Sequence, residues 1–263
     1  MMVLKELTDI IESFAPLSLQ ESYDNSGLIV GRPSDEVHKA LLAVDVTDEV
    51  IDEAEREGCD IIITHHPIVF HPLKRFNSAN MVERCVERAI RQGIALYACH
   101  TNLDSTAEGM SWRLASMLGV ENLEVLQPTT AGEPTGFGVI GTLAEPMPTE
   151  KFLRRVMDVT GAEVVRHSDI ATEQTRRVAV CTGSGAFLIG EARKAGADVY
   201  ITADLKYNDF MTPDRALTVA DIGHFESEYC AIEILFDILS KKFLTFAVRK
   251  SECSRNPINY LTK

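Results

Sequence analysis

The sequence has few cysteines, and none of them lie close together. Six cysteines are scattered along 263 residues, without the short Cys-x-x-Cys spacing of zinc ribbons or thioredoxin-like redox motifs. We interpret them as reduced thiols, because free cysteine in an apolar run behaves as a small hydrophobic residue and a chain of this length needs no disulfides. The cysteines therefore predict neither a structural zinc site nor a disulfide framework.

Long apolar runs and a surplus of basic residues are absent too. No run of about 18 consecutive apolar residues occurs, so the sequence predicts no membrane-spanning helix, and its first residues do not form a signal peptide. We therefore expect a cytoplasmic protein. Lys and Arg number 26 against 39 Asp and Glu, a formal net charge of −13. This charge repels polyphosphates, which argues against nucleic acid as a partner.

The apolar pattern indicates an α/β fold. Hydrophobic residues make up 45% and charged residues 25% of the chain, as in ordinary globular proteins. In the first half the pattern predicts strand 40–46, helix 48–57, strand 59–64, helix 79–92, strand 94–99 and helix 106–118. This alternation is typical of a parallel sheet. A strand at 137–143, expected to pair outside that sheet, is followed by helix 149–159, strands 162–166, 178–182, 198–202 and 216–220, and helix 226–241.

A short internal repeat suggests that the two halves are similar. The segments Gly58–Thr64 and Gly196–Thr202 share the pattern Gly-x-Asp, two apolar residues and Ile-Thr, and each precedes a strand that ends at a histidine. We interpret the repeat as a duplicated half-domain, although any two βα units resemble one another because they share the same physics. We therefore predict two similar α/β lobes, 1–128 and 129–263, with a ligand site in the cleft between them.

Side chains that bind metals come directly after the predicted strands, where open α/β sheets hold their ligands. They are His65 and His66 after strand 59–64, Asp104 after 94–99, and His224 and Glu228 after 216–220. Side chains alternate along a strand, so two adjacent histidines suit two cations better than one. His224 and Glu228 are four residues apart on one helical face and could serve a single centre. Histidine and carboxylate ligands together favour Zn, Mn, Fe or Ni over Ca or Mg.

Other polar residues have weaker functional interpretations. His100 is either a metal ligand or a partner that orients Asp104. Lys206 and Tyr207 either contact an anionic substrate or begin a helix. The Gly183–Gly185 turn could cradle a phosphate, but without a full fingerprint a tight turn is the better interpretation. Isolated histidines are more often hydrogen-bonded structural residues than ligands, and we place three in that class: His38, His71 and His167.

Five segments, taken together, resemble the NIF-three-like family, also catalogued as GTP cyclohydrolase I type 2 homologues. They span nearly the whole chain: 24–31 (DNSGLIVG), 64–67 (THHP), 100–104 (HTNLD), 196–202 (GADVYIT) and 223–228 (GHFESE). The His-His-Pro, Asn-Leu-Asp and Gly-His-Phe-Glu-Ser-Glu segments are specific as a set. One departure is Ala203, which stands where many relatives have glycine.

The resemblance implies two α/β lobes, a dinuclear metal centre between them and a ring-shaped hexamer built as a trimer of dimers. The extra domain that some members insert between the halves is absent here. Carried over position by position, the resemblance assigns His65 and His224 to one metal, His66 and Asp104 to the other, and Glu228 to both.

The expected function depends on that centre. Two cations that share a carboxylate activate a bridging water and polarise the bond it attacks, which is hydrolytic chemistry. We therefore expect a metal-dependent hydrolase with Glu228 as its catalytic residue. The family resemblance further implies two divalent transition metals per chain and a nucleotide such as GTP as the substrate. The alternative is a non-catalytic metal-binding or regulatory scaffold whose ring matters more than turnover, because fold and metal do not fix function.

Overall fold

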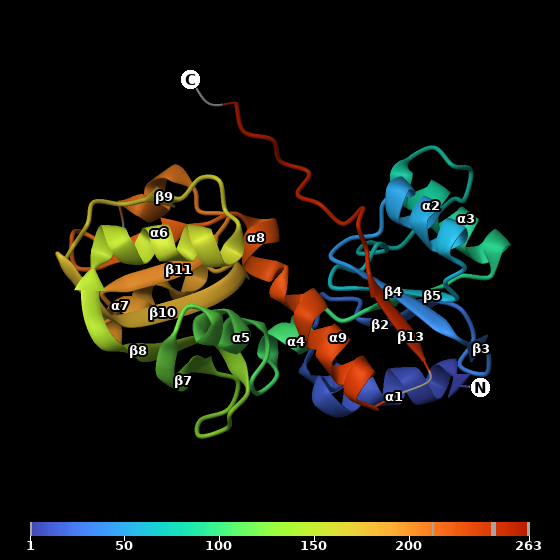
Figure 1. Cartoon of the computed structure of the whole chain (residues 1–263), viewed down its shortest axis with the longest axis horizontal. Helices are drawn as coiled ribbons and strands as arrows, with labels where there is room; N and C mark the ends of the chain where they lie inside the picture. Colours follow the sequence, from blue (N-terminus) through green and yellow to red (C-terminus); the bar gives the residue numbers. More distant parts are fainter. Residues whose placement is uncertain (1, 212, 243–245, 262–263) are drawn as a thin grey trace. The chain divides into compact units, whose positions relative to one another are not determined.

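The computed structural model of the chain describes residues 2–211, 213–242 and 246–261. The chain forms two compact units, whose elements are labelled in Figure 1. Unit 1 comprises Met1–Thr106 and Ala231–Arg255, and unit 2 comprises Ala107–Cys230 and Asn256–Lys263. The predicted α/β class is confirmed. The boundaries differ from the expected 1–128 and 129–263, because each unit takes residues from two separate stretches of the chain.

Unit 1 is built on a five-stranded sheet with the order β13-β4-β5-β6-β2. Its strands are β2 (Gly27–Val30), β4 (Lys39–Ala43), β5 (Ile61–Thr64), β6 (Ala95–Ala98) and β13 (Ala247–Lys250). β13, β4, β5 and β6 run parallel, and β2 pairs antiparallel with β6 at the edge. Because β13 adds to β4 from the far end of the chain, the residues after 230 return to this unit.

Five helices accompany this sheet: α1 (Leu4–Phe14), α2 (Asp48–Glu57), α3 (Met81–Gln92), α4 (Thr101–Ser105) and α9 (Cys230–Lys242). A short helical turn η1 (Leu17–Leu19) and a ribbon of β1 (Met2–Val3) with β3 (Glu36–Val37) complete the unit. α2 has the predicted bounds, because the Thr47 side chain accepts from the Val50 N–H at its start and Gly58 takes a left-handed φ of 64° at its end.

Unit 2 is built on a six-stranded sheet with the order β7-β8-β10-β11-β12-β9. Its strands are β7 (Val120–Pro128), β8 (Gly136–Pro148), β9 (Arg166–His167), β10 (Gln174–Ser184), β11 (Val199–Ala203) and β12 (Thr218–Asp221). β10, β11 and β12 run parallel, while β7, β8 and β9 add antiparallel pairs. The helical elements are α5 (Met110–Met117), α6 (Thr149–Thr160), η2 (Ala186–Leu188), α7 (Ile189–Lys194), η3 (Tyr207–Phe210) and α8 (His224–Glu228).

Some predicted elements change their bounds or their type. The predicted helix 106–118 begins only at Met110, because Glu108 takes a left-handed φ of 56° that interrupts helical backbone. The predicted strand 162–166 is reduced to the two residues of β9, and the predicted helix 226–241 is divided into α8 and α9. The polar stretch 100–104 becomes the short helix α4, which places Asp104 in its first turn.

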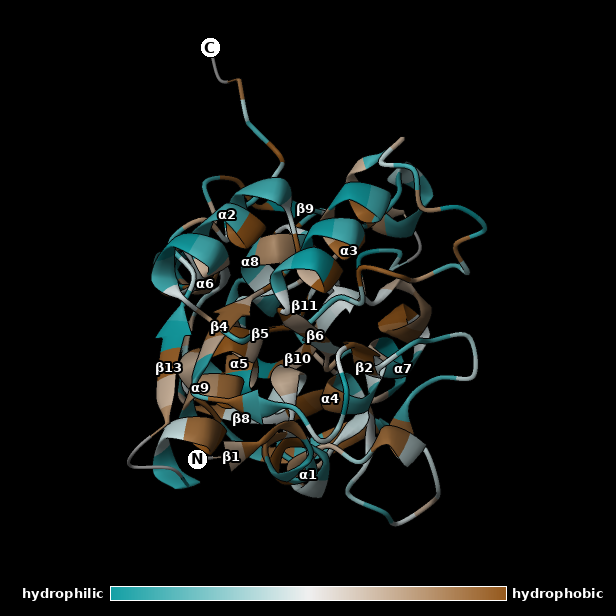
Figure 2. Ribbon diagram, turned by 90° about the vertical axis from the view of Figure 1, so that its right-hand side faces the viewer, coloured by the Kyte–Doolittle hydropathy of each residue, from teal (hydrophilic) through white to brown (hydrophobic). Residues whose placement is uncertain are grey.

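Each unit has its own hydrophobic core. In unit 1 the core contains Leu41, Ile62 and Leu96 from three adjacent parallel strands, and in unit 2 it contains Ala179, Tyr200 and Val219 from the corresponding strands. Figure 2 shows the contrast with the surface, where the visible faces of α2 and α3 are largely hydrophilic. In the part of the chain that the structure describes, no helix is long and apolar enough to cross a membrane.

Candidate metal centre

The first two candidate ligands come directly after β5. The His65 side chain is fully buried, and its Nδ1 donates to the backbone carbonyl of Cys99 at 2.8 Å. Because a carbonyl can only accept, this bond places the proton on Nδ1 and the lone pair that a metal needs on Nε2. The His66 side chain is 23% exposed, and its Nδ1 lies 2.8 Å from Oδ1 of Asp45.

His100 comes after β6 and is held in the same way. Its Nδ1 lies 2.7 Å from Oδ1 of Asp24, whose side chain is fully buried. The Asp24 carboxylate also accepts from the Thr101 N–H at 3.1 Å and from the Ser26 hydroxyl at 2.9 Å. Burial alone would raise the pKa of Asp24, but the hydrogen bonds from His100 and Thr101 outweigh it and hold that pKa well below its usual range.

Unit 1 thus brings together four side chains that could hold a metal ion. His65, His66 and His100 each offer a ring nitrogen, and these atoms all lie within 4.8 Å of one another. On α4, Oδ1 of Asp104 lies 3.9 Å from Nε2 of His65. His100 thus lies in the same group as His65, His66 and Asp104, and the assignment of these side chains to metal ions stays a prediction.

Unit 2 contributes a histidine between two carboxylates. His224 and Glu228 share one face of α8, with Nε2 of His224 2.9 Å from Oε2 of Glu228. Asp204, in the loop after β11, places its Oδ2 2.8 Å from Nδ1 of the same ring. Burial lowers the pKa of His224, but Glu228 and Asp204 together raise it to about 9. Without a metal, His224 is therefore an imidazolium at neutral pH.

The Glu228 carboxylate occupies the space that a side chain at position 183 would fill, so this position requires glycine. Gly183 comes after the central part of β10 with a left-handed φ of 63°, and a Cβ at this position would lie 2.2 Å from Oε1 of Glu228. Its N–H donates to the Ser227 hydroxyl at 2.9 Å. Gly183 is therefore a point of close approach to a candidate ligand. The turn predicted at Gly183–Gly185 does not form as expected, because Gly183 and Ser184 belong to β10, where a register shift precedes Ser184.

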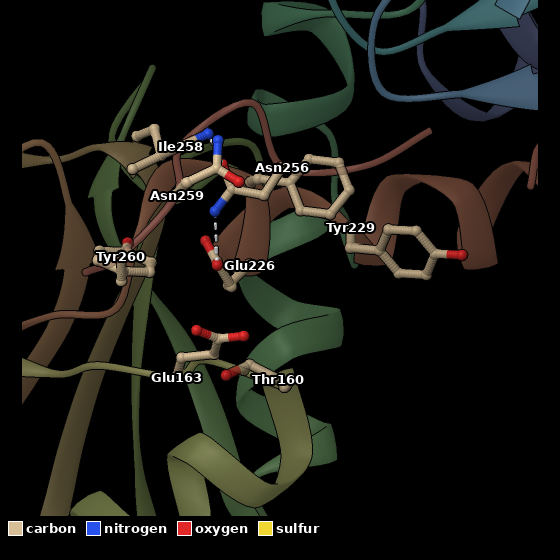
Figure 3. Close-up of a pocket in the computed structure, with 10 residues that line it drawn as sticks. Thr160, Glu163, Glu226, Tyr229, Asn256, Ile258, Asn259 and Tyr260 are labelled. Carbon is tan, nitrogen blue, oxygen red and sulfur yellow. Dashed lines mark hydrogen bonds between the residues drawn. The ribbon is translucent and has the colours of Figure 1, made fainter. Parts of the chain in front are cut away.

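A cavity of about 590 Å³ lies in unit 2 beside α8. Its lining includes the end of α6, Glu163 and Glu226, as Figure 3 shows, and from the C-terminal segment Asn256, Ile258, Asn259 and Tyr260. Oε1 of Glu226 accepts from the Asn256 side chain at 2.7 Å. Glu226 therefore faces this cavity and Asn256, whereas the neighbouring His224 and Glu228 face each other, and Glu226 is not a member of the donor pair.

The remaining polar candidates lie at the surface. Tyr207 is 81% exposed, and Lys206, which precedes it, uses its backbone N–H to cap η3 through Asp209. Their role toward a substrate remains a prediction. His38 and His167 are exposed and lie beside Asp60 and the Ser168 carbonyl, respectively, which agrees with a structural role.

Three carboxylates that hold histidine rings are absent from the set of candidates that the sequence indicated: Asp24, Asp45 and Asp204. A signal was present for two of them, since Asp45 and Asp204 lie just past the strands β4 and β11. Residues at such strand ends are well placed to orient a ligand. Asp24 opens one of the segments that carry the family resemblance.

The donor sets fit divalent transition metals. Imidazole nitrogens together with carboxylate oxygens suit Zn, Mn, Fe and Ni. Histidines that bind metals almost always use their other ring nitrogen to hydrogen-bond a carboxylate or a backbone carbonyl, which fixes the ring and its tautomer. His65, His66, His100 and His224 all have this support at Nδ1.

A family model described as Duf34/NIF3 (NGG1p interacting factor 3) matches residues 2–257. Among curated relatives, a protein of Clostridium perfringens named "GTP cyclohydrolase 1 type 2 homolog" is 34% identical over 230 residues, or 87% of each chain. A protein of Clostridium acetobutylicum with the same name is 33% identical over 235 residues, covering 88% of this chain and 87% of that one.

Solved structures share the fold over nearly the full length. A Bacillus cereus protein related to NIF3 superposes with a TM-score of 0.89 at 24% identity, covering 99% of both chains. Reduced HcgD from Methanocaldococcus jannaschii superposes with a TM-score of 0.80 at 27% identity, covering 95% of this chain and 98% of that one. The likeness therefore extends over both units and is not confined to one sheet.

Proposed function

The chain belongs to the Duf34/NIF3 family, and from that premise we propose that it is a metal-dependent hydrolase with two divalent transition metal ions per chain. In this proposal His65 and His224 hold one ion, His66 and Asp104 hold the other, and Glu228 bridges them. Zn, Fe, Mn and Ni all suit these donors. The proposed ligands come from both units, three from unit 1 and two from unit 2.

One observation carries the proposal: the rings of His65, His66 and His224 each have an oxygen partner at Nδ1, which leaves Nε2 as the nitrogen that could bind a metal. A structural histidine needs no such uniform arrangement. When bound, a pair of metal ions would supply a nucleophile at neutral pH and polarise the bond under attack.

The protein's own residues have separate tasks in this chemistry. Glu228 is almost fully buried, at 4% side-chain exposure, and its carboxylate would serve as the ligand shared by the two ions. Asp204 keeps the His224 ring in place through its Nδ1. Gly183 leaves the space that the Glu228 carboxylate occupies.

For the substrate we favour a nucleotide, with GTP as the first candidate, because the curated relatives carry the name of GTP cyclohydrolase homologues. The chain's charge of −13 opposes a polyphosphate. Bound metal ions would offset that repulsion locally.

We further expect a cytoplasmic homohexamer, built as a trimer of dimers. Light scattering tests this assembly, and a monomer at micromolar concentration would contradict it.

The test is turnover with a defined metal content. Protein loaded with Zn, Mn or Fe is incubated with GTP, other nucleotides and a model phosphodiester, beside Glu228→Ala. Glu226→Gln is the matched control, because Glu226 lies on the same helix but faces the cavity and Asn256. We expect Glu228→Ala to abolish turnover and Glu226→Gln to retain it. Two bound metals without turnover of any substrate would contradict the hydrolase and support the non-catalytic scaffold.

A further inference from the structure

We infer that His100 is itself a metal ligand, and that His65, His66 and His100 form a three-histidine site able to hold one metal ion with no donor from unit 2. This rests on the proposed function and deepens it: there His65 and His66 hold different ions and His100 holds none, whereas the three-histidine site is the arrangement of unit 1 with a single ion bound. It also predicts an order of loading, because unit 1 would take a metal ion before the centre is completed by His224 and Glu228.

The three rings converge at one point of unit 1. The ring centroids are 4.9 Å apart for His65 and His66, 5.1 Å for His65 and His100, and 5.4 Å for His66 and His100. Their ligand atoms lie within 4.8 Å of one another. Bonds of about 2.0–2.1 Å in a tetrahedral zinc site separate the donors by about 3.4 Å. Ring movements on the order of 1 Å therefore suffice to close the site.

Among the three histidines, His100 has the Nδ1 partner that is itself held by the most hydrogen bonds. Asp24, its partner at Nδ1, is fully buried and accepts from the backbone and hydroxyl of Thr101 and from the Ser26 hydroxyl. A carboxylate held by this many donors cannot turn away, so it fixes the ring and directs Nε2 away from itself. Asp24 is thus a positioning residue for His100, as Asp45 is for His66.

The donor count is sufficient for a metal site. Catalytic zinc sites commonly have three protein ligands and one open position, and three histidines form one such set. Asp104, with its Oδ1 3.9 Å from Nε2 of His65, is close enough to serve as a fourth ligand from the same unit. The competing interpretation is that His100 only anchors Asp24 and the start of α4, in which case metal content would not depend on the ring.

The test removes the donors of unit 2 and then probes unit 1. We expect the His224→Ala/Glu228→Gln double variant, prepared metal-free and dialysed against Zn²⁺ or Co²⁺, to bind about one ion per chain. Adding His100→Ala should weaken that binding by more than the roughly 10–100-fold that loss of a supporting residue costs. His38→Ala in the same double variant is the control, since His38 is exposed and lies beside Asp60. Unchanged affinity after His100→Ala would overturn the inference.

A second pair of variants keeps the test independent of folding. Asp45→Asn should weaken Co²⁺ binding by about 10–100-fold, because Asp45 is 43% exposed and its removal leaves no buried gap. Asp24→Asn should do the same through His100. Thermal unfolding of the metal-free proteins and the visible Co²⁺ spectrum are measured beside affinity. A variant that lowers stability but leaves the affinity and spectrum of the folded fraction unchanged has a structural role only, and would contradict the positioning.

The outcomes separate this inference from the proposed function. Wild-type protein that binds two ions, with no effect of His100→Ala on either, would retain the dinuclear centre and reject the three-histidine site. Wild-type protein that binds a single ion, lost on His100→Ala and retained in the unit 2 double variant, would support the three-histidine site and reject the dinuclear hydrolase.

Discussion

The two sheets differ in size but share an arrangement of four adjacent strands. In unit 1, β4, β5 and β6 lie side by side in parallel and an antiparallel strand, β2, lies next to β6 at the edge; in unit 2, β10, β11 and β12 do the same with β9. The Gly-x-Asp motifs also make equivalent bonds. The Asp60 carboxylate accepts from the backbone N–H groups of His38 and Lys39. The Asp198 carboxylate accepts from those of Arg176 and Arg177. The shared geometry agrees with a duplicated half-domain, which remains our interpretation.

The units differ in the residues that come after the middle parallel strand. After β5, unit 1 has the adjacent candidate ligands His65 and His66, whereas after β11, unit 2 has Asp204 in a left-handed conformation with a φ of 57°. After the third strand both units have a histidine, His100 and His224, and each is held at Nδ1 by an aspartate. One scaffold therefore carries a cluster of imidazoles in unit 1 and a histidine between carboxylates in unit 2.

The largest effect we expect is the loss of metal. Purified protein should contain close to two transition-metal equivalents per chain. Asp104→Asn, in unit 1, and His224→Ala, in unit 2, should each remove about one equivalent, or more if the sites are cooperative. Both side chains lie past strand ends, so neither change opens a core cavity, unlike Ile62→Ala, which should cost roughly 2–5 kcal/mol. Elemental analysis beside thermal unfolding measures both effects, and full occupancy in either variant would remove that residue from the centre.

Next in size is a pH dependence specific to unit 2. The folded pKa of His224 is raised to about 9, above the unperturbed value of about 6.5. The stability that protonated His224 contributes is therefore fully present below about pH 6.5 and is lost as pH rises through about 9. Metal-free wild type should lose free energy of unfolding across this window, and His224→Gln should show a flatter profile. Identical profiles for the two proteins would show that the pair with Glu228 and Asp204 does not form.

The affinity of His224 for a metal ion should change with pH in the opposite direction to the stability of the metal-free protein. A metal ligand must lose its proton, so metal affinity at His224 should increase as pH rises toward about 9. The three histidines of unit 1 provide the comparison, through the His224→Ala/Glu228→Gln variant. Metal titrations at several pH values measure the difference in slope between wild type and that variant, and equal slopes would contradict the prediction.

The candidate donors could be proposed from the sequence, but which carboxylate supports which histidine ring could not. Histidines and carboxylates just past apolar strands are visible along the chain, because strand ends of a parallel sheet share one edge. The supporting pairs join residues that are distant in sequence: Asp24 is 76 residues from His100, and Asp45 is 21 residues from His66. Such pairs depend on how the loops fold over the strand ends, which periodicity does not encode.

The boundaries of the two units could not be predicted from the sequence pattern either. The alternation of helices and strands identifies the α/β class and the parallel strands of both sheets. It does not show that β13 adds to β4 or that α5 and β7 group with the second sheet, because those are long-range pairings. The predicted boundary near 128 reflects composition, whereas the chain divides according to which strands hydrogen-bond.

We expect a smaller effect from substitutions that test the close approach of Gly183 to Glu228 in unit 2. Gly183→Ala would place a Cβ within 2.2 Å of Oε1 of Glu228, whereas Gly196→Ala, also at a positive φ, meets no atom within 4 Å. Both variants should lose about 1 kcal/mol from backbone strain. Only Gly183→Ala should also displace Glu228 and weaken metal binding. Equal metal affinity in the two variants would show that Glu228 does not need this space.

The smallest expected effect is a difference close to zero between the two Gly-x-Asp motifs. Asp60→Ala and Asp198→Ala each remove a carboxylate that accepts two backbone N–H groups at the start of a parallel strand. Each should cost about 1.5–3 kcal/mol, the range for hydrogen bonds to charged groups. Because the two units need not unfold together, hydrogen exchange of the Lys39 and Arg177 amides is the suitable measurement. We expect each variant to accelerate exchange in its own unit by a similar factor. A large effect in one unit and none in the other would show that the repeated motif supports the two sheets in different ways.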